Sequence, residues 1–191
     1  MEKLLKELVE RIESAAGTNL TAVVLYGSAA AGEFHPEYSD LNVLCVVQRL
    51  DSAAVAGLGA AARWWAAKGH PAPLLFTAEE LRRSADVFAI ELMDIREKHR
   101  LLYGSDVVSG IEVPRTLHRL QVERELRVHL IRLRQALLTA GDDRKALLAL
   151  LTRAASSLIT LLKHALLALG ETPPREKRGI VERAAELFAF D

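Results

Sequence analysis

The chain has 191 residues and a mass of 21.0 kDa, a length that suits one ordinary domain or two small ones. Half of its residues are apolar and 25 basic residues balance 25 acidic ones, so the composition excludes a disordered chain and a protein that binds nucleic acid through a large positive charge. The single cysteine, Cys45, excludes an internal disulfide and a zinc site built from several thiolates.

Helical and extended patterns alternate in the first fifty residues. Residues 2–16 place their leucines on one stripe and stop at Gly17, which predicts an amphipathic helix. Two short apolar runs rich in β-branched residues, 20–26 and 41–47, predict buried strands. The small and polar residues 28–39 between them predict a turn followed by a loop.

An alanine-rich segment and a third strand follow. Residues 52–68 predict a helix, and 74–76, which come after a proline-containing breaker, predict a strand. Thr77 and Glu80 have the spacing of a capping box, so a short helix is predicted directly after this strand.

The segment 87–95 fits either a strand or a helix. Its β-branched residues and the neighbouring strands favour a strand, and 101–103 predict one more short strand. On a strand, Glu91 and Asp94 point to opposite sides, so at most one of them can share a site with Asp40.

Long helical periodicity replaces this alternation after residue 114. Residues 116–139 and 143–169 predict two long helices separated by Gly141-Asp142, and a third helix is predicted from about residue 175. The third pattern has no stop signal before the chain ends, from which we expect the sequence to be a fragment of a slightly longer protein.

These patterns predict an α+β protein with two domains. Residues 1–110 are expected to form a small mixed β-sheet with flanking helices, and residues 115–191 an all-α helical bundle that is truncated at its C-terminal end. Charge supports two modules, because residues 1–114 hold 11 basic and 16 acidic residues whereas residues 115–191 hold 14 and 9.

The segment between the first two predicted strands carries the chemistry. The first strand ends at Gly27-Ser28, where glycine lets a ligand approach the backbone and the N–H groups of the next turn favour an anion such as phosphate. Asp40 and Asn42 lie two apart at the start of the second strand, so their side chains share a face. Two oxygen ligands beside a phosphate-binding turn are what a magnesium–triphosphate site requires.

This arrangement resembles the signature of the DNA polymerase beta-like nucleotidyltransferase superfamily: Gly-Ser, a spacer, then an acid, an apolar residue and a second acid on a strand. The spacer, residues 29–39, has eleven residues and ends in Ser39 before Asp40, which is similar to the small bacterial branch of antibiotic nucleotidyltransferases and MNT antitoxins.

The resemblance extends to about residue 110. The triplet around Glu91 and the run Leu101–Gly104 resemble the later strand that bears the third carboxylate of the family and the tail that follows it. The helical remainder resembles the C-terminal bundles that are fused to bacterial members of this group.

The resemblance implies a mechanism and a set of site residues. A nucleoside monophosphate would pass from a triphosphate bound with Mg²⁺ (or Mn²⁺) to a hydroxyl of a small-molecule or protein acceptor. Three residues would bind the nucleotide: Gly27, Ser28 and Ser39. Three would hold the metal: Asp40, Asn42 and Glu91. Asp40 and Glu91 would be the catalytic residues, with Glu91 as third ligand or general base.

Asn42 departs from the family pattern, which has a second carboxylate at this position. An amide oxygen can bind a hard cation but has no charge to offset it, so a clamp of two metals is weakened. The loss is expected to be on the order of a thousandfold in rate. Two alternatives stay open: an enzyme, which is slightly favoured, and a catalytically degenerate nucleotide-binding or regulatory protein that binds a partner, as an antitoxin does.

A third and weaker alternative comes from the helical half. Arg124 and His129 match the loose arginine–histidine spacing of HEPN-type RNases, a pattern that any helix with arginines and histidines can produce by chance. The bundle-facing stripe of the same helix favours a structural interpretation.

Targeting and partners are predicted from the ends and the apolar runs. The first residues are charged, unlike a signal peptide, and the long apolar stretch 146–170 is interrupted by Arg153 and Lys163. We therefore expect a cytoplasmic protein with no membrane partner and no nucleic-acid partner, and a homo-oligomer stays open.

Overall fold

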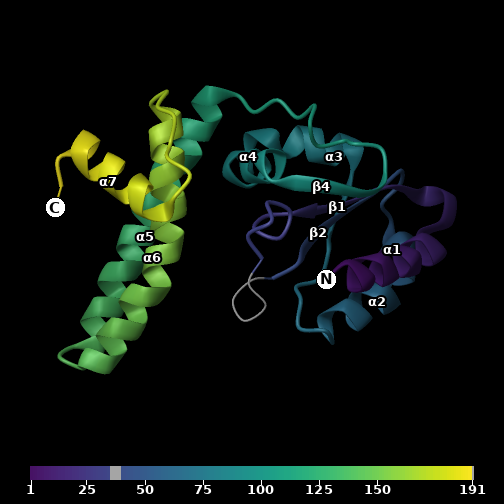
Figure 1. The fold of residues 1–191 in the computed structure, drawn as a ribbon, viewed down its shortest axis with the longest axis horizontal. Coiled ribbons are helices and arrows are strands. Elements are labelled where there is room, and N and C mark those ends of the chain that lie inside the picture. Colours follow the sequence, from purple (N-terminus) through teal and green to yellow (C-terminus); the bar gives the residue numbers. More distant parts are fainter. Residues whose placement is uncertain (35–39, 191) are drawn as a thin grey trace. The chain divides into compact units, whose positions relative to one another are not determined.

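The computed structural model of the chain describes residues 1–34 and 40–190. The chain divides into two compact units, Met1–Val113 and Pro114–Asp191, each with its own hydrophobic core. The first unit contains a mixed sheet with helices, and the second contains helices (Figure 1). The predicted α+β class is confirmed.

Four strands form the sheet of the first unit: β1 (Leu20–Tyr26), β2 (Asn42–Val47), β3 (Leu74–Thr77) and β4 (His99–Gly104). Their order is β3-β2-β1-β4, with β1 antiparallel to both β2 and β4, and β2 parallel to β3. The apolar, β-branched runs of β1 and β2 are central and almost wholly buried, as expected for strands covered on both faces.

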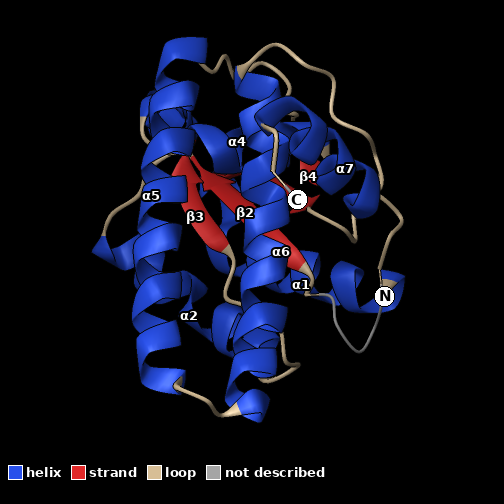
Figure 2. Cartoon of the chain, turned by 90° about the vertical axis from the view of Figure 1, so that its left-hand side faces the viewer, coloured by secondary structure: helices blue, strands red, loops and turns tan. Residues whose placement is uncertain are grey.

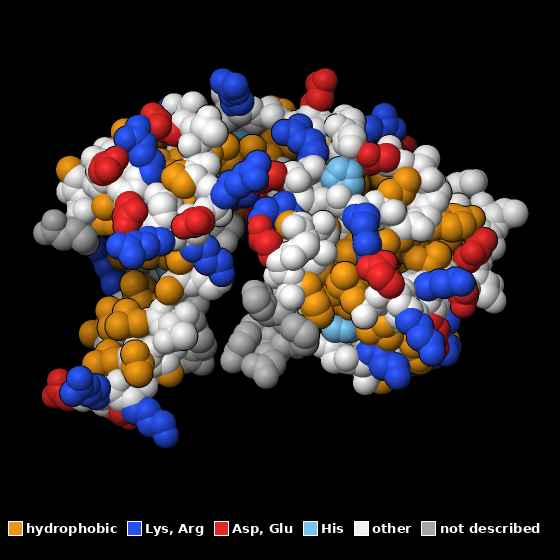
Figure 3. Space-filling model, viewed as in Figure 1, with side chains coloured by type: hydrophobic (Ala, Val, Ile, Leu, Met, Phe, Trp, Pro, Cys, Tyr) orange, Lys and Arg blue, Asp and Glu red, His pale blue; other side chains and the backbone are white. Residues whose placement is uncertain are grey.

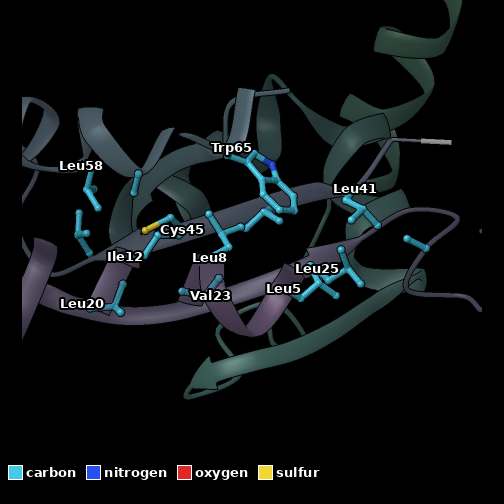
Figure 4. Packing of buried hydrophobic residues seen from close by; sticks show 14 residues of the cluster. Leu5, Leu8, Ile12, Leu20, Val23, Leu25, Leu41, Cys45, Leu58 and Trp65 are labelled. Atoms are coloured by element: carbon cyan, nitrogen blue, oxygen red, sulfur yellow. The ribbon is translucent and has the colours of Figure 1, made fainter. Parts of the chain in front are cut away.

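Two helices, α1 (Glu2–Ala16) and α2 (Ser52–Ala66), cover one face of the sheet (Figure 1). Figure 4 shows the buried cluster that they form with β1 and β2: Leu5, Leu8, Ile12, Val23, Leu25, Cys45, Leu58 and Trp65. Cys45 is buried there, and burial raises the pKa of its thiol to about 12. Cys45 is therefore a thiol of the hydrophobic core.

The opposite face is covered by α3 (Ala78–Arg83), the 3-10 turn Ser84–Asp86 and α4 (Ala89–Glu97). The capping box that starts α3 is present, because Thr77 Oγ1 accepts from the Glu80 N–H at 3.1 Å and Glu80 Oε2 accepts from the Thr77 N–H at 2.8 Å. This cap fixes where β3 ends and where the helical layer begins.

The strand predicted over residues 87–95 is wrong, because these residues lead into helix α4. Ala89, Leu92 and Ile95 are buried at a spacing of three residues, which places them on one helical face against the sheet. This tertiary contact outweighs the β-branched content on which the strand prediction depended. The strand expected at 101–103 exists and begins two residues earlier, as β4.

Three helices form the second unit: α5 (Arg115–Ala140), α6 (Arg144–Ala168) and α7 (Lys177–Phe188). Helices α5 and α6 lie side by side as an antiparallel hairpin (Figure 2). Gly141 ends α5 with a positive φ of 54°, and the Asp143 carboxylate accepts from two backbone N–H groups at the start of α6.

Helix α7 ends before the end of the chain. Ala189 takes a left-handed conformation, with φ 54° and ψ 52°, and its N–H bonds to the Ala185 carbonyl. The expectation that the last helix is still running at Asp191 is therefore wrong.

Helix α6 is long and apolar. Among the helices of the described residues it alone has the length and composition that could cross a membrane, and 12% of its most apolar stretch is buried. Length and composition are weak evidence by themselves, so the expectation of no membrane partner stays a prediction.

Candidate functional site

The end of β1 makes a tight corner at Gly27. Its φ of 81° lies in the left-handed region, which glycine adopts without strain. The Gly27 N–H donates to the Lys98 carbonyl at 2.9 Å, and its own carbonyl accepts from the N–H groups of Ala30 and Ala31. These bonds fix the corner between β1 and the residue that precedes β4.

The turn after the corner presents backbone donors. Within the described residues, no carbonyl accepts a hydrogen bond from the N–H of Ser28 or Ala29. The turn closes when the Glu33 N–H donates to the Ser28 carbonyl at 2.9 Å. Two such N–H groups at the first turn after a strand form a local positive end that favours an anion.

Asn42 lies against this corner. The β1–β2 register pairs Tyr26 with Asn42, and a Cβ built on Gly27 would lie 3.5 Å from Asn42 Nδ2. Asp40 is exposed and comes two residues before Asn42, with the buried Leu41 between them. It precedes β2, so the shared face that strand alternation gives Asp40 and Asn42 stays a prediction. The register therefore brings Gly27 and Asn42 to the same end of the sheet, and a pocket that Gly27 shares with Asp40 stays a prediction.

His70, in the loop after α2, contacts the residues that precede β2. Its Nδ1 accepts from the Leu41 N–H at 3.4 Å, and its ring packs on Trp65 with the centroids 4.6 Å apart. Partial burial lowers the pKa of His70, and the nearby Asp40 carboxylate opposes this shift. An imidazole, rather than a second acid, therefore stands beside Asp40.

Of the predicted site residues, one is placed differently from expectation and another is not described. Ser39 lies outside the described residues. Glu91 is not on a strand but in the first turn of α4, where its side chain is exposed. Asp94 follows one helical turn later, so the expectation that Glu91 and Asp94 point to opposite sides is also wrong, because residues three apart on a helix lie on neighbouring positions.

The sheet carries no third carboxylate. None of the residues in β1, β2, β3 or β4 is Asp or Glu, and all four strands lie within the described residues. The resemblance predicted an acid on a strand beside Asp40. The outer strands do not supply it, since β3 consists of Leu, Leu, Phe and Thr, and the first residue of β4 is His99.

His99 is a residue that sequence reasoning missed. The register pairs it with Tyr26, so Asn42, Tyr26 and His99 form a row across three strands at the corner end of the sheet. Its Nδ1 lies 3.0 Å from the Arg96 carbonyl and its Nε2 lies 3.4 Å from Asp106 Oδ2. Both ring nitrogens therefore have a hydrogen-bond partner.

Asp106 holds the loop behind His99. Its carboxylate accepts from the Ser109 hydroxyl at 2.5 Å and from the N–H groups of Ser109 and Val108. These hydrogen bonds, the Ser109 hydroxyl first, lower the pKa of Asp106 well below its usual range. The pKa of the Tyr26 phenol moves in the opposite direction, because burial raises it.

The donor set does not fit a site for two metal ions. Within the described residues, no group of three or more His, Cys, Asp or Glu side chains is arranged to hold a metal. Asp40 and Asn42 offer one charged and one neutral oxygen ligand, and Mg²⁺ requires six ligands in near-octahedral geometry. The remaining oxygens would have to come from a bound phosphate chain and from water.

The HEPN-like pair does not converge. Arg124 and His129 both lie within α5, and five residues along an α-helix turn the side chains by about 140° from each other. Arg124 is paired with Glu125 at 2.7 Å. The geometry therefore gives no support to an RNase site at these two residues.

Comparisons with known proteins identify the fold. A scan against protein-family models found no match, and a search of curated proteins found none. Among solved structures, the spectinomycin adenyltransferase AAD(9) from Enterococcus faecialis, with ATP and spectinomycin, is 15% identical with a TM-score of 0.57, and the match covers 97% of this chain and 83% of that chain.

Two further structures match with lower scores. A toxin–antitoxin with AMP-PNP is 15% identical over 66% of this chain and 98% of that chain, with a TM-score of 0.39. A tri-AMPylated Shewanella oneidensis HEPN toxin in complex with an MNT antitoxin is 15% identical over 69% and 99%, with a TM-score of 0.37. The fold assignment therefore depends on the adenyltransferase.

The sheet order and this likeness together define the fold. The chain has the fold of the polymerase beta-like nucleotidyltransferases, as the Gly-Ser and Asp40 signature predicted.

Proposed function

We propose that this chain binds a nucleoside triphosphate at the Gly27 corner and transfers its nucleotidyl group weakly or not at all. The observation that carries the proposal is a site that keeps the corner but has no acid on any strand of the sheet. Of the two alternatives that the sequence left open, this one is the degenerate nucleotide-binding protein.

Three features support triphosphate binding. The N–H groups of Ser28 and Ala29 suit a phosphate oxygen, and the Asn42 amide beside the corner can donate a hydrogen bond where a carboxylate would repel the phosphate. The adenyltransferase with the same fold was solved with ATP, which makes ATP the first ligand to test.

The weakness of transfer follows from the missing charges. A clamp of two metals stabilises the attacking and leaving oxygens of the transition state through carboxylates that the ions share. Asp40 alone can attract one ion to the triphosphate, and Glu91 is on a helix instead of a strand. A loss on the order of a thousandfold in rate is expected from each missing charged ligand, at several kcal/mol apiece.

A binding site without efficient chemistry is suited to regulation. The proposed role is a cytoplasmic protein whose contact with a protein partner depends on bound nucleotide, as opposed to modification of a small-molecule hydroxyl. Modification of a small-molecule hydroxyl stays the alternative, because the same fold serves an adenyltransferase in AAD(9).

Calorimetry with ATP, with and without Mg²⁺, tests the binding. Wild type is expected to bind in both conditions, and more tightly with Mg²⁺, because Asp40 then shares the ion with the phosphates. Asp40→Ala should remove the Mg²⁺ effect and keep the metal-free binding. Glu79→Ala, on the exposed side of α3, is the control and should change neither. No binding in either condition would contradict the proposal.

Restoring the second acid tests the chemistry. Asn42→Asp is expected to raise Mg²⁺-dependent pyrophosphate release from ATP by at least tenfold, which corresponds to about 1.4 kcal/mol of barrier. Gln48→Glu makes the same amide-to-acid change just beyond the other end of β2 and should give no increase. A wild type that already turns over ATP as fast as Asn42→Asp would contradict the proposed defect.

A further inference from the structure

The leucines in the outer part of the α5–α6 hairpin, residues 123–160, are not buried in a hydrophobic core. From Glu123 to Thr160, no residue whose side chain is described is buried, yet this segment contains ten leucines. Hydrophobic side chains are visible along the lower part of the hairpin in Figure 3. Two helices that pack only on each other leave most of their apolar surface in water, which a folded domain rarely tolerates.

One apolar stripe of α6 is exposed to solvent. Leu148, Leu151, Ala155 and Leu158 follow each other at spacings of three and four residues, the pattern of a helix–helix seam. Leu148 keeps 66% of its surface open, Leu151 55% and Leu158 36%.

The same stripe is covered where it continues toward the C-terminal end of α6. The next position of the seam, Leu162, is buried with Leu166 against Ile180 and Ala184 of α7. In Figure 2, α7 lies beside the upper half of α6 only. The open stripe is therefore the uncovered continuation of an existing helix–helix contact.

Two leucines of α5 widen this surface. Leu130 and Leu137 are seven residues apart and therefore on one side of α5, about a quarter turn from the partly buried Leu133 and Ala136 that face α6. The α6 stripe is likewise about a quarter turn from the partly buried side of α6, which is formed by Leu147, Leu150 and Ala154. Because the two right-handed helices are antiparallel, both quarter turns lead to the same side of the hairpin.

The hairpin face formed by Leu130, Leu137, Leu148, Leu151 and Leu158 is apolar at these five positions and self-complementary along α6. We propose that it binds the same face of a second copy of this chain, so that two hairpins form an antiparallel four-helix bundle. The stripe is symmetric about residue 153: Leu148 would meet Leu158 of the second copy, and Leu151 would meet Ala155. Such a contact is isologous, the commonest kind in homodimers.

The size and chemistry of the face favour a second copy. Five partly open leucines give a patch on the order of 400 Å², within the range in which apolar patches mark interaction sites. An interfacial lipid-bound helix carries Lys and Arg along its polar side. On α6, between Lys145 and Lys163, the polar residues are serines and threonines apart from Arg153.

The mass of the full chain in solution tests the proposal. Light scattering is expected to give twice 21.0 kDa for wild type, falling toward one chain on dilution. Leu151→Arg should halve the measured mass without lowering helix content, because Leu151 is already exposed. Ala149→Arg, about 160° away around α6, is the matched control and should stay dimeric.

Cross-linking tests the orientation. Chains carrying Leu148→Cys, mixed with chains carrying Leu158→Cys, should form a disulfide-linked dimer on oxidation, and either variant alone should not. A monomer at every concentration, or a dimer that Leu151→Arg leaves intact, would overturn the proposal. Monomeric wild type that sediments with vesicles of anionic phospholipid would overturn it in favour of a membrane surface.

Discussion

At the scale of single residues, the candidate site has the glycine and the first acid of the predicted signature, and other side chains stand where further acids were expected. Gly27 keeps a backbone conformation that few other residues adopt, and Asp40 comes two residues before Asn42, which lies at the corner. Asn42 and His99 place an amide and an imidazole, instead of further carboxylates, at the same end of the sheet. Such a site suits the binding of an anion better than the binding of two dications.

The corner itself can be tested with a pair of glycines. Gly27→Ala and Gly32→Ala each force alanine to a positive φ, 81° and 77°, so each should cost about 1–2 kcal/mol of stability in thermal or urea unfolding. Only the Gly27 methyl would contact the Asn42 amide, since nothing lies within 4 Å of a Cβ at Gly32. We therefore expect ATP affinity to fall in Gly27→Ala alone; equal affinities in both variants would place the nucleotide elsewhere.

The loop at Asp106 predicts an acid-dependent stability. A lowered pKa in the folded state means that this carboxylate stabilises the fold above its unfolded pKa of about 3.9, and that the effect is lost as the pH falls toward the lowered value. Asp106→Asn should therefore melt below wild type at pH 6, with the difference shrinking below about pH 4. A difference that grows on acidification would contradict this assignment.

At the scale of elements, local signals succeeded where one residue type decides the geometry. The glycine stops, the capping box and the buried runs of β1 and β2 were predictable, because turn and cap residues act over a few positions. A candidate site at this end of the sheet could be predicted as well, since Gly27 follows β1, Asp40 precedes β2, and these two strands pair.

Helix α4 could not be predicted in the same way. Its residues have both β-branched content and a helical spacing of apolar positions, and only packing on the sheet decides between them. The error carried over to Glu91, whose expected place depended on a strand. The place of His99 depended on the β1–β4 register, which includes an irregularity and leaves no trace in the sequence.

The cap of α3 gives a quantitative test at this scale. Thr77→Ala should lower the free energy of unfolding by about 1 kcal/mol, because the Glu80 N–H loses its acceptor at the first turn. Glu79→Gln, one residue before Glu80 and outside the capping box, should change stability by less than half of that. Denaturant unfolding followed by circular dichroism measures both, and equal losses would show that the box contributes nothing.

At the scale of the whole molecule, the two units differ in how they are stabilised. The first unit buries both faces of its sheet, whereas among the described side chains of the second, burial is confined to the start of α5, the C-terminal end of α6 and α7. Two modules with separate cores are expected to unfold separately, so a single two-state transition does not describe the chain.

A fragment of residues 1–113 tests this independence. It contains both clusters that sandwich the sheet, and is expected to show its own cooperative thermal transition. The matched control is a fragment of residues 1–97, which lacks β4 and so exposes the hydrogen-bonding edge of β1; it should show no such transition. A fragment 1–113 that melts without cooperativity would mean that the sheet depends on the helical unit.

The reactivity of the buried Cys45 thiol in β2 can report local unfolding of the first unit. The sequence holds one cysteine, and only its thiolate reacts with alkylating dyes, so labelling must wait for the sheet to expose Cys45. The rate of dye incorporation then measures how often the first unit opens, while the helices of the second unit, which have no sulfhydryl group, remain silent. Nucleotide bound at the corner would slow that incorporation by the fraction of molecules it holds closed.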